Sequence, residues 1–165
     1  MDGTFSTRFV GPYLRFHKWV YEWSDGRVGK HSNRVPALLL TTTGRKSGQA
    51  RTHGLTYCAD RGDYVVVASN GGSERPPAWL LNLEADPEVT VRVGRRVFHA
   101  TARVATDEEQ AQLWPKLNRT NRGMAPLFHP GASGRYDVYQ KHTSRHIPVV
   151  IISPERPEPP GRTVD

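Results

Sequence analysis

From residue 37 onward the sequence is divided into short segments rich in Val, Leu, Thr and aromatic residues, separated by turns that contain glycine. Six segments are expected to be strands: Ala37–Thr43, Thr52–Ala59, Tyr64–Ser69, Val89–Val93, Val97–Ala105 and His146–Ser153. The turns Arg61-Gly62-Asp63 and Gly94-Arg95-Arg96 are short enough for tight hairpins. A sheet of about six antiparallel strands must cover or close its edges, and a small barrel does so economically. The pattern therefore predicts an α+β, mainly β fold.

Four segments with helical character accompany these strands. The clearest follows Thr106-Asp-Glu-Glu109, a capping box in which the Thr hydroxyl and the Glu carboxylate each bind a backbone N–H group, so a helix is expected from Asp107 to about Leu117. Less regular patterns predict helices over three further ranges: Pro12–Trp23, Pro76–Leu83 and Tyr136–His142. Residues Asn118–Arg135 contain three glycines and two prolines and are interpreted as a long loop.

A chain of 165 residues is long enough for one domain with a proper core. We expect a lead-in with the first helix over residues 1–34, a barrel domain over 35–154 and a Pro-rich tail over 155–165. The longest apolar runs fall short of the ~20 residues of a membrane-spanning helix. The N-terminus lacks the pattern of a secretory signal, so a cytoplasmic protein is expected.

The expected N-terminal helix has an unusually aromatic apolar face. In one interpretation this face covers the open side of the barrel. In the other, the helix lies on a membrane surface with Arg8, Arg15 and Lys18 facing lipid headgroups. The protein would then be peripheral at the inner face of the membrane.

The formal net charge of +7 favours an anionic partner: a phosphorylated cofactor, nucleic acid or acidic lipid. Nucleic acid is the least favoured, because no run of five or more like charges occurs. The seven histidines do not form a convincing metal site, and no G-x-S-x-G hydrolase elbow is present. Cys58 is interpreted as a core residue. The sequence points to an organic cofactor and to no metal.

The most informative stretch is Gly44-Arg-Lys-Ser-Gly-Gln-Ala-Arg51, between the first two expected strands. Two glycines bracket polar residues, so the turn can offer backbone N–H groups to an anion, while charge and a hydroxyl come from Arg45, Lys46, Ser47 and Arg51. It is not a P-loop, because Lys46 follows Gly44 too closely and a strand comes next. A phosphate site is one interpretation, and a solvated hairpin turn is the other.

A second polar turn, Ser69-Asn-Gly-Gly-Ser73, follows a strand and precedes Trp79 and Asn82. A flexible polar turn beside an indole and an amide can hold a planar heterocycle, since such pockets pair apolar walls with a few placed polar groups. Taken alone, Trp79 is more typical of an ordinary core position than of a ring wall.

Several blocks of the sequence, in this order, resemble the deazaflavin-dependent nitroreductases, small enzymes that use coenzyme F420. The blocks are Leu39-Leu-Thr-Thr-Thr-Gly-Arg-Lys-Ser-Gly-Gln-Ala-Arg51, Val66-Val-Ala-Ser69, Pro77-Ala-Trp-Leu-Leu-Asn-Leu83 with Asp86-Pro87, Ala105-Thr-Asp-Glu-Glu109, Trp114-Pro115 and Arg145-His-Ile-Pro-Val-Val150. Together they cover roughly Val35 to Pro154. The resemblance implies an FMN-binding-like split β-barrel.

The resemblance also implies roles for the two turns and for two tyrosines near the end of the chain. The phosphate of the cofactor would be held by Lys46, Ser47 and Arg51, together with Arg45. The deazaflavin ring would lie close to Ser69, Asn70, Gly71, Trp79 and Asn82. The expected catalytic residues are Tyr136, Tyr139 and Ser69, because a phenol near the substrate can donate a hydrogen bond or a proton to developing negative charge. In the family, lysine can replace Asn70, and Met124–Arg135 looks like an insertion.

The expected reaction is hydride transfer from reduced coenzyme F420 to an electron-poor acceptor such as a quinone or an activated nitro compound. A separate dehydrogenase would regenerate the reduced cofactor. Two alternatives stay open: an FMN-dependent oxidoreductase of the same barrel class, and a non-catalytic deazaflavin carrier. A homodimer is also compatible with the sequence.

Overall fold

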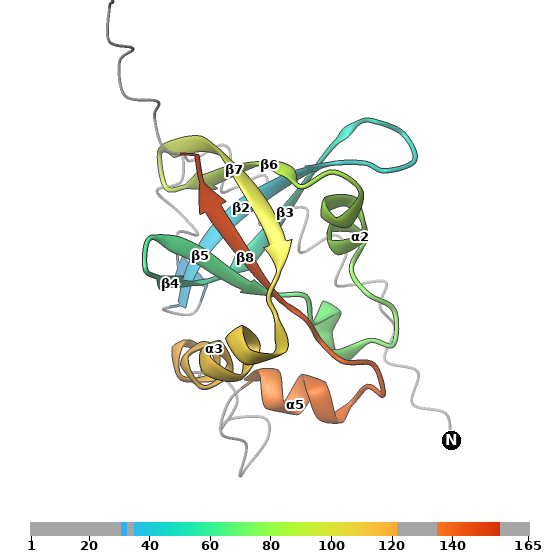
Figure 1. The fold of residues 1–165 in the computed structure, drawn as a ribbon, viewed down its shortest axis with the longest axis vertical. Coiled ribbons are helices and arrows are strands. Elements are labelled where there is room, and N and C mark those ends of the chain that lie inside the picture. Colours follow the sequence, from blue (N-terminus) through green and yellow to red (C-terminus); the bar gives the residue numbers. More distant parts are fainter. Residues whose placement is uncertain (1–30, 33–34, 122–134, 156–165) are drawn as a thin grey trace, which may run out of the picture.

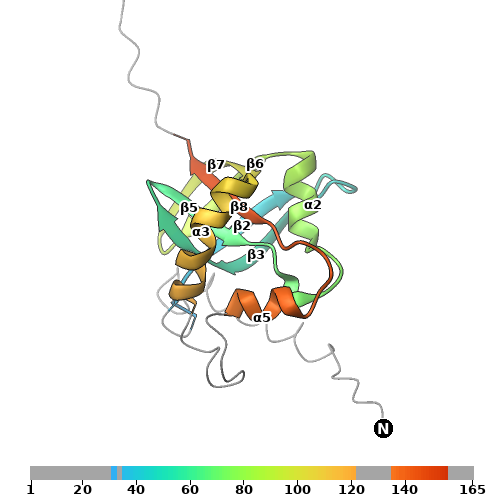
Figure 2. The ribbon, with the colours of Figure 1, turned by 60° about the horizontal axis from the view of Figure 1, so that its bottom comes forward.

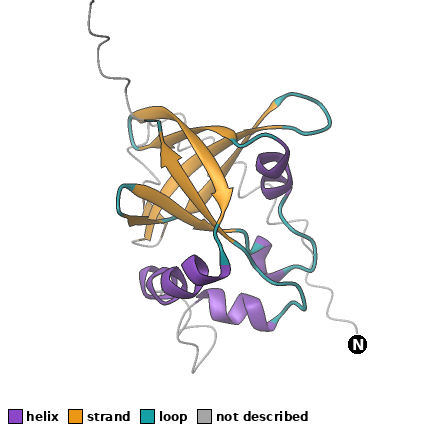
Figure 3. Cartoon of the chain, in the orientation of Figure 1, coloured by secondary structure: helices purple, strands orange, loops and turns teal. Residues whose placement is uncertain are grey.

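The computed structural model describes residues 31–32, 35–121 and 135–155. The expected helix over Pro12–Trp23, the expected insertion between Met124 and Arg135, and the tail after Glu155 lie outside the described residues. The described part is a curled antiparallel sheet with helices packed at its margins (Figures 1 and 3). This arrangement confirms the predicted mainly β, barrel-like fold.

Eight strands form the sheet within the described residues: β1 (His31–Ser32), β2 (Val35–Thr43), β3 (Ala50–Thr56), β4 (Cys58–Asp60), β5 (Asp63–Val67), β6 (Glu88–Val93), β7 (Arg96–Val104) and β8 (Val149–Pro154). Their order is β1-β2-β6-β7-β8-β5-β4, with β3 also paired to β2. All pairings are antiparallel. The last strand of the sequence therefore lies between the β4–β5 and β6–β7 hairpins and joins them.

Both tight hairpins expected from the sequence are present. Strands β4 and β5 pair Asp60 with Asp63, which leaves Arg61 and Gly62 as the turn. Both turn residues have positive φ angles, 51° and 95°, as a type I′ turn requires. A second two-residue turn joins β6 and β7 at the expected place.

The expected strand over Thr52–Ala59 is divided in two. At Tyr57 the backbone N–H donates to the carbonyl of Pro36 at 3.0 Å, at the start of β2, and the chain then turns into β4. Strand β3 thus ends at Thr56 on β2, whereas β4 pairs with β5. This division accounts for one of the strands beyond the predicted six.

The final strand begins later than expected, at Val149 instead of His146. Gln110 of the helix over residues 107–120 explains the delay. Its side-chain amide donates to the carbonyl of Ile147 at 3.0 Å and accepts from the N–H of Val149 at 3.0 Å. A buried side chain therefore occupies the backbone groups that a neighbouring strand would otherwise pair.

The helices are α2 (Ala78–Ala85), α3 (Asp107–Thr120) and α5 (Arg135–Lys141), together with a short 3-10 helix η1 (Asn70–Gly72). The three described helices expected from the sequence are confirmed. The loop prediction was wrong over residues 118–120, which continue α3. Asn118 explains the extension, because its carboxamide oxygen accepts from the N–H groups of Tyr136 and Asp137 at the start of α5.

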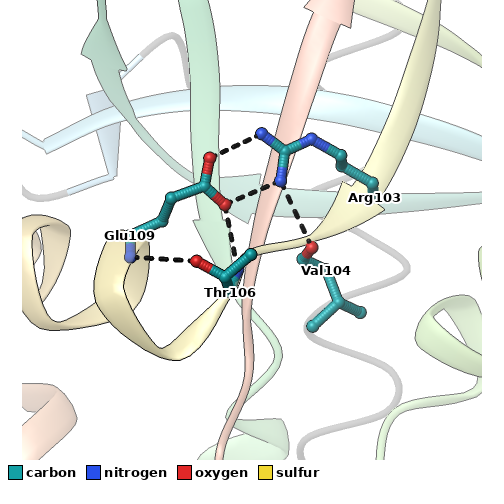
Figure 4. Close-up of polar contacts among 4 residues, drawn as sticks. All are labelled: Arg103, Val104, Thr106 and Glu109. Atoms are coloured by element: carbon teal, nitrogen blue, oxygen red, sulfur yellow. Dashed lines mark hydrogen bonds and ion pairs between the residues drawn. The ribbon is translucent and has the colours of Figure 1, made fainter.

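Helix α3 begins with the predicted capping box (Figure 4). The Glu109 N–H donates to the Thr106 hydroxyl at 3.3 Å, and the Thr106 N–H donates to the Glu109 carboxylate at 2.9 Å. Arg103, at the end of β7, adds two hydrogen bonds of 2.7 Å to the same carboxylate. These donors, with the Arg103 hydrogen bond as the main cause, lower the pKa of Glu109 to about 2. The helix start is thereby tied to the strand before it.

The core consists of two clusters on opposite sides of the sheet, since successive strand residues face opposite ways. In β5, Val66 belongs to the inner cluster inside the curl, which includes Trp79, Leu80 and Leu83 of α2. Val65 and Val67 belong to the helix-side cluster, whose members are Cys58, Val65, Val67, Ala105, Leu113, Leu117, Tyr136, Ile147, Val149 and Ile151. Helix α3 accordingly crosses the face formed by β5 and β8 (Figure 2). Cys58 is buried, as expected, and burial raises the pKa of its thiol.

Candidate cofactor site

The turn between β2 and β3 projects beyond the sheet beside α2 (Figure 1). It presents the exposed side chains of Arg45, Lys46 and Arg51. Among the described residues, no carboxylate contacts any of these three cations. A group of cations without an acidic partner is a favourable place for a phosphate, because binding does not have to break an existing ion pair.

Asn82 of α2 fixes the position of this turn. It is only 4% exposed. Its carboxamide nitrogen donates to the Thr42 hydroxyl at 3.1 Å, and its oxygen accepts from the backbone N–H of Arg45 at 3.1 Å. These hydrogen bonds link α2 to the cationic turn and position it. The predicted location of Asn82 near the deazaflavin ring stays a prediction.

The backbone of the turn is largely committed to its own structure. The N–H groups of Gly44, Ser47 and Gly48 donate within the turn, and that of Gln49 donates to the Ser47 hydroxyl at 3.3 Å. The sequence suggested that such N–H groups would be offered to an anion, and in these four cases they are not. Charged side chains and the remaining donor capacity of Ser47 are left for a ligand. This donor set fits a phosphate.

Gly44 allows the tight closure of the turn. A β-carbon at this position would lie 2.8 Å from the Ser47 hydroxyl oxygen and 3.1 Å from the carbonyl oxygen of Gln49. Both distances are shorter than ordinary contacts, so another residue would push the turn open.

The second polar turn, Ser69–Ser73, has an unusual backbone. Asn70, Gly71 and Gly72 all have positive φ angles, 46°, 65° and 81°. The Asn70 carboxamide is exposed and donates to the carbonyl of Arg75 at 2.9 Å. Ser69 is half-buried and Gly71 is exposed. Ser69, Asn70 and Gly71, which were predicted to line the ring, therefore lie together at one margin of the sheet, directly after β5.

Two residues that the sequence analysis did not select hold this second turn. The Arg145 guanidinium group donates to the carbonyls of Ala68, Ser69 and Ser73 at 2.8 to 3.0 Å. Next to it, the Glu74 carboxylate accepts from the backbone N–H and the hydroxyl of Ser144 at 2.8 and 2.9 Å, and these bonds lower the pKa of Glu74. The only sequence signal was the position of Arg145 in the last block of the family resemblance.

Trp79 lies in the inner cluster and is 3% exposed. Of its two interpretations, the core position is therefore the one that the structure supports. Its indole packs with Leu80 and Leu83 of the same helix against the inside of the sheet.

The two tyrosines of α5 differ in their surroundings. Tyr136 is 4% exposed, and its hydroxyl bonds with the Thr56 hydroxyl at 3.0 Å and accepts from Asn121 at 2.8 Å. Burial is the main cause that raises the pKa of Tyr136 to about 12. Tyr139 is half-buried, with its ring edge-on to Tyr136 at a centroid distance of 6.4 Å. The expected pair thus contains one hydrogen-bonded core tyrosine and one at the surface.

Among the residues that the structure describes, no group of three or more potential metal ligands is close enough to hold an ion. No helix in this part of the chain is sufficiently long and apolar to cross a membrane.

A curled antiparallel sheet of this topology, with a cationic hairpin at one margin, defines a protein of the FMN-binding split-barrel class. Comparison with known proteins narrows the class. Residues 13–154 match the model of the F420H(2)-dependent quinone reductase family. An F420H(2)-dependent quinone reductase of Mycobacterium tuberculosis H37Rv is 41% identical over 150 residues, which cover 88% of this chain and 93% of the relative. The chain belongs to the F420H(2)-dependent quinone reductase family.

Solved structures agree with this assignment. The structure of an F420-H2 dependent reductase is 36% identical, with a TM-score of 0.55, and the match covers 72% of this chain and 94% of that one. A structure described as a domain-swapped dimer is 32% identical, with a TM-score of 0.56, and covers 82% and 98%. The protein is an oxidoreductase that uses coenzyme F420, and the family resemblance inferred from the sequence is confirmed at the level of F420-dependent reductases.

Proposed function

We propose that this protein transfers a hydride from reduced coenzyme F420 to a quinone, and that it holds the cofactor between the cationic turn Gly44–Arg51 and the Ser69–Ser73 turn. The observation that carries the proposal is the cationic turn, which is exposed, lacks a carboxylate partner among the described residues and is fixed by Asn82. The choice of a quinone as the acceptor comes from the names of the relatives.

Lys46 and Arg51 are the principal phosphate ligands in this proposal. Both are exposed, and among the described residues the Arg51 side chain makes only a long hydrogen bond of 3.4 Å to Gln49. Arg45 contributes charge from the same turn, although its side chain also approaches Asn82 at 3.5 Å. Ser47 adds its hydroxyl proton, since its oxygen already accepts from Gln49. Charge-assisted hydrogen bonds of this kind are the strong ones in phosphate recognition.

The Ser69–Ser73 turn is the proposed support for the ring. Bound in its reduced form, coenzyme F420 supplies the hydride. The residues of the turn orient the ring, with Ser69, Asn70 and Gly71 presenting a hydroxyl, a carboxamide and open backbone. Gly71 leaves room for close approach, because no atom of the described part of the chain lies within 4 Å of a β-carbon built at that position.

Tyr139 is the proposed donor on the acceptor side. It lies on α5 and is half-buried, and the backbone of its residue is in contact with Gly72 of the second turn. Its phenol can hydrogen-bond to the acceptor oxygen on which negative charge develops, and water can replace the proton that this oxygen takes. Tyr136 supports Tyr139 from inside the helix-side cluster, since its own hydroxyl is occupied.

The wider setting of the reaction is also a proposal. The cofactor diffuses to and from a separate F420-reducing dehydrogenase in the cytoplasm. A lipid-soluble quinone would favour peripheral contact with the inner membrane face through the N-terminal helix expected over Pro12–Trp23. The relative described as a domain-swapped dimer supports a test for a homodimer. A nitro compound is the alternative acceptor.

Parallel titrations with oxidised coenzyme F420 and FMN test the cofactor and its phosphate site. We expect selective binding of F420, followed by a loss of about a hundredfold in affinity in the Lys46→Ala, Arg51→Ala double variant, since two charge-assisted bonds are worth about 3 kcal/mol together. Arg119→Ala is the matched control, because Arg119 is an exposed cation on α3, away from both turns. Preference for FMN, or unchanged affinity in the double variant, would contradict the proposal.

Turnover separates an enzyme from a carrier. We expect reduced F420 to be oxidised when menadione is added and to remain reduced without an acceptor. Binding of F420 without turnover on any quinone or nitro compound would instead support the carrier alternative.

A further inference from the structure

We propose that Arg145 is a positioning residue for the cofactor: it holds the Ser69–Ser73 turn in the shape that meets the deazaflavin ring. The inference rests on the proposed function, because that function places the ring at this turn. It concerns a residue about seventy positions further along the chain, whose bonds of 2.8 to 3.0 Å reach back to the turn.

The guanidinium group of Arg145 forms hydrogen bonds to both ends of the turn. One terminal nitrogen donates to the carbonyls of Ala68 and Ser69 at 3.0 and 2.8 Å, before η1. The Nε atom donates to the carbonyl of Ser73 at 2.8 Å, after η1. The planar guanidinium fork therefore sets the separation between the two ends.

The turn requires an external support of this kind. Three successive residues, Asn70, Gly71 and Gly72, have positive φ angles, a conformation that glycine and asparagine tolerate but do not by themselves enforce. Within the turn, only the N–H groups of Gly72 and Ser73 donate back to its own carbonyls, at 2.9 and 3.2 Å. A conformation with so few bonds of its own persists when surrounding groups determine it.

Further contacts seat the turn on the end of α5. The Glu74 carboxylate accepts from both the N–H and the hydroxyl of Ser144, next to Arg145. A β-carbon on Gly72 would lie 3.0 Å from the carbonyl oxygen of Tyr139, so the two backbones touch at this point. The Arg145 clamp consequently fixes the ring-side turn relative to Tyr139 on the proposed acceptor side.

Lysine cannot replace arginine in this arrangement. A lysine carries its donors on one terminal nitrogen, whereas the three carbonyls are bonded here by two nitrogens of a rigid plane. Arg145→Lys therefore keeps the charge and the stem of the side chain but loses part of the clamp. This conservative variant also keeps the test informative if Arg145→Ala fails to fold.

The test compares wild type, Arg145→Lys, Arg145→Ala and the control Arg119→Ala in two measurements. The first is amide hydrogen exchange in the protein without cofactor. The second is the dissociation constant for oxidised F420, measured with and without low millimolar guanidinium, which can occupy the space left in Arg145→Ala.

In the exchange measurement, we expect the Gly72 and Ser73 amides to exchange at least about tenfold faster in Arg145→Ala, because their protection depends on the shape of the turn. The Gly44 and Gly48 amides of the cationic turn should not change. In the binding measurement, we expect F420 affinity to fall by about tenfold in Arg145→Ala, less in Arg145→Lys, and to recover with guanidinium only in the alanine variant. Arg119→Ala should match wild type.

The outcomes separate the inference from the function on which it rests. If wild type does not bind F420, the proposed function fails. If wild type binds F420 and Arg145→Ala binds it equally well, or if exchange at Gly72 and Ser73 is unchanged, Arg145 is not a positioning residue. A general loss of protection across the sheet in both Arg145 variants would show a role in folding alone and would also overturn the inference.

Discussion

The two turns at the proposed cofactor site are built on opposite plans. The Gly44–Arg51 turn closes through its own backbone and one buried anchor, Asn82, and leaves its charged side chains outside. The Ser69–Ser73 turn has little internal bonding and is held by Arg145 and Glu74, neither of which lies inside it. The first turn is therefore suited to binding charge, and the second to presenting a shape determined by another part of the chain.

Matched glycine substitutions should separate the two plans most strongly. Gly72→Ala combines a positive φ of 81° with a β-carbon 3.0 Å from the Tyr139 carbonyl, whereas Gly48 has a φ of 66° and nothing within 4 Å. We expect Gly72→Ala to lower the free energy of unfolding by about 3 kcal/mol and Gly48→Ala by about 1 kcal/mol. Urea unfolding measures both. Equal losses in the free energy of unfolding would mean that the backbone of the second turn is no more constrained than that of the first.

Removing the anchor of the first turn should have the next largest effect. Asn82→Ala leaves the oxygen of the Thr42 hydroxyl, which is 1% exposed, without its donor and the Arg45 N–H without its acceptor. We expect a loss of about 2 kcal/mol in the free energy of unfolding, together with weaker F420 binding. If F420 affinity is unchanged while stability falls, the position of the turn does not matter for the ligand.

Substitution of the two α5 tyrosines should distinguish a structural role from a catalytic one. Tyr136→Phe removes a hydroxyl bonded to Thr56 and Asn121, so we expect a loss of about 1 to 2 kcal/mol in the free energy of unfolding. Tyr139→Phe should leave stability nearly unchanged and lower kcat for quinone reduction by about a hundredfold, the lower end of the effect of a positioned acid. The opposite pattern, with kcat dependent on Tyr136 alone, would reverse the assignment.

The smallest expected effect is a pH dependence of stability at the start of α3, which lies outside both turns. The pKa of Glu109 is lowered to about 2 in the folded protein, mainly by Arg103, from an ordinary value of 4.5. Its contribution is therefore complete above about pH 4.5 and is lost as pH falls toward 2. Glu109→Gln should flatten the fall in unfolding midpoint between pH 5 and about 3. An unchanged pH profile would show that the capping pair is not coupled to global stability.

Local chemistry accounts for what could be predicted from the sequence. The capping box at Thr106 and the turn at Arg61-Gly62 involve residues at most a few positions apart, and both were predicted correctly. The five β-rich segments between residues 37 and 105 predicted the sheet because strand composition and turn residues are also local signals. The cationic residues of the first turn were recognisable because they are adjacent in the sequence.

The failures involve contacts between distant residues. Gln110 delays the start of β8 from 37 and 39 residues away, and Arg145 reaches Ser69 across 76 residues. No periodicity or turn signal encodes such a pairing. The burial of Asn82 and Trp79, both of which were predicted to lie close to the ring, likewise depends on how α2 packs on the sheet.

The place of β8 in the sheet has a consequence for how the protein is made. Strand β8 pairs with both β5 and β7. These two strands are synthesised before β8, so each keeps one unpaired edge until β8 has been made. Open strand edges are where nascent chains mispair or aggregate. The same late segment carries Arg145, so binding competence should arrive together with closure of the sheet. A chain released before that segment would be vulnerable to aggregation and would lack the proposed Arg145 clamp.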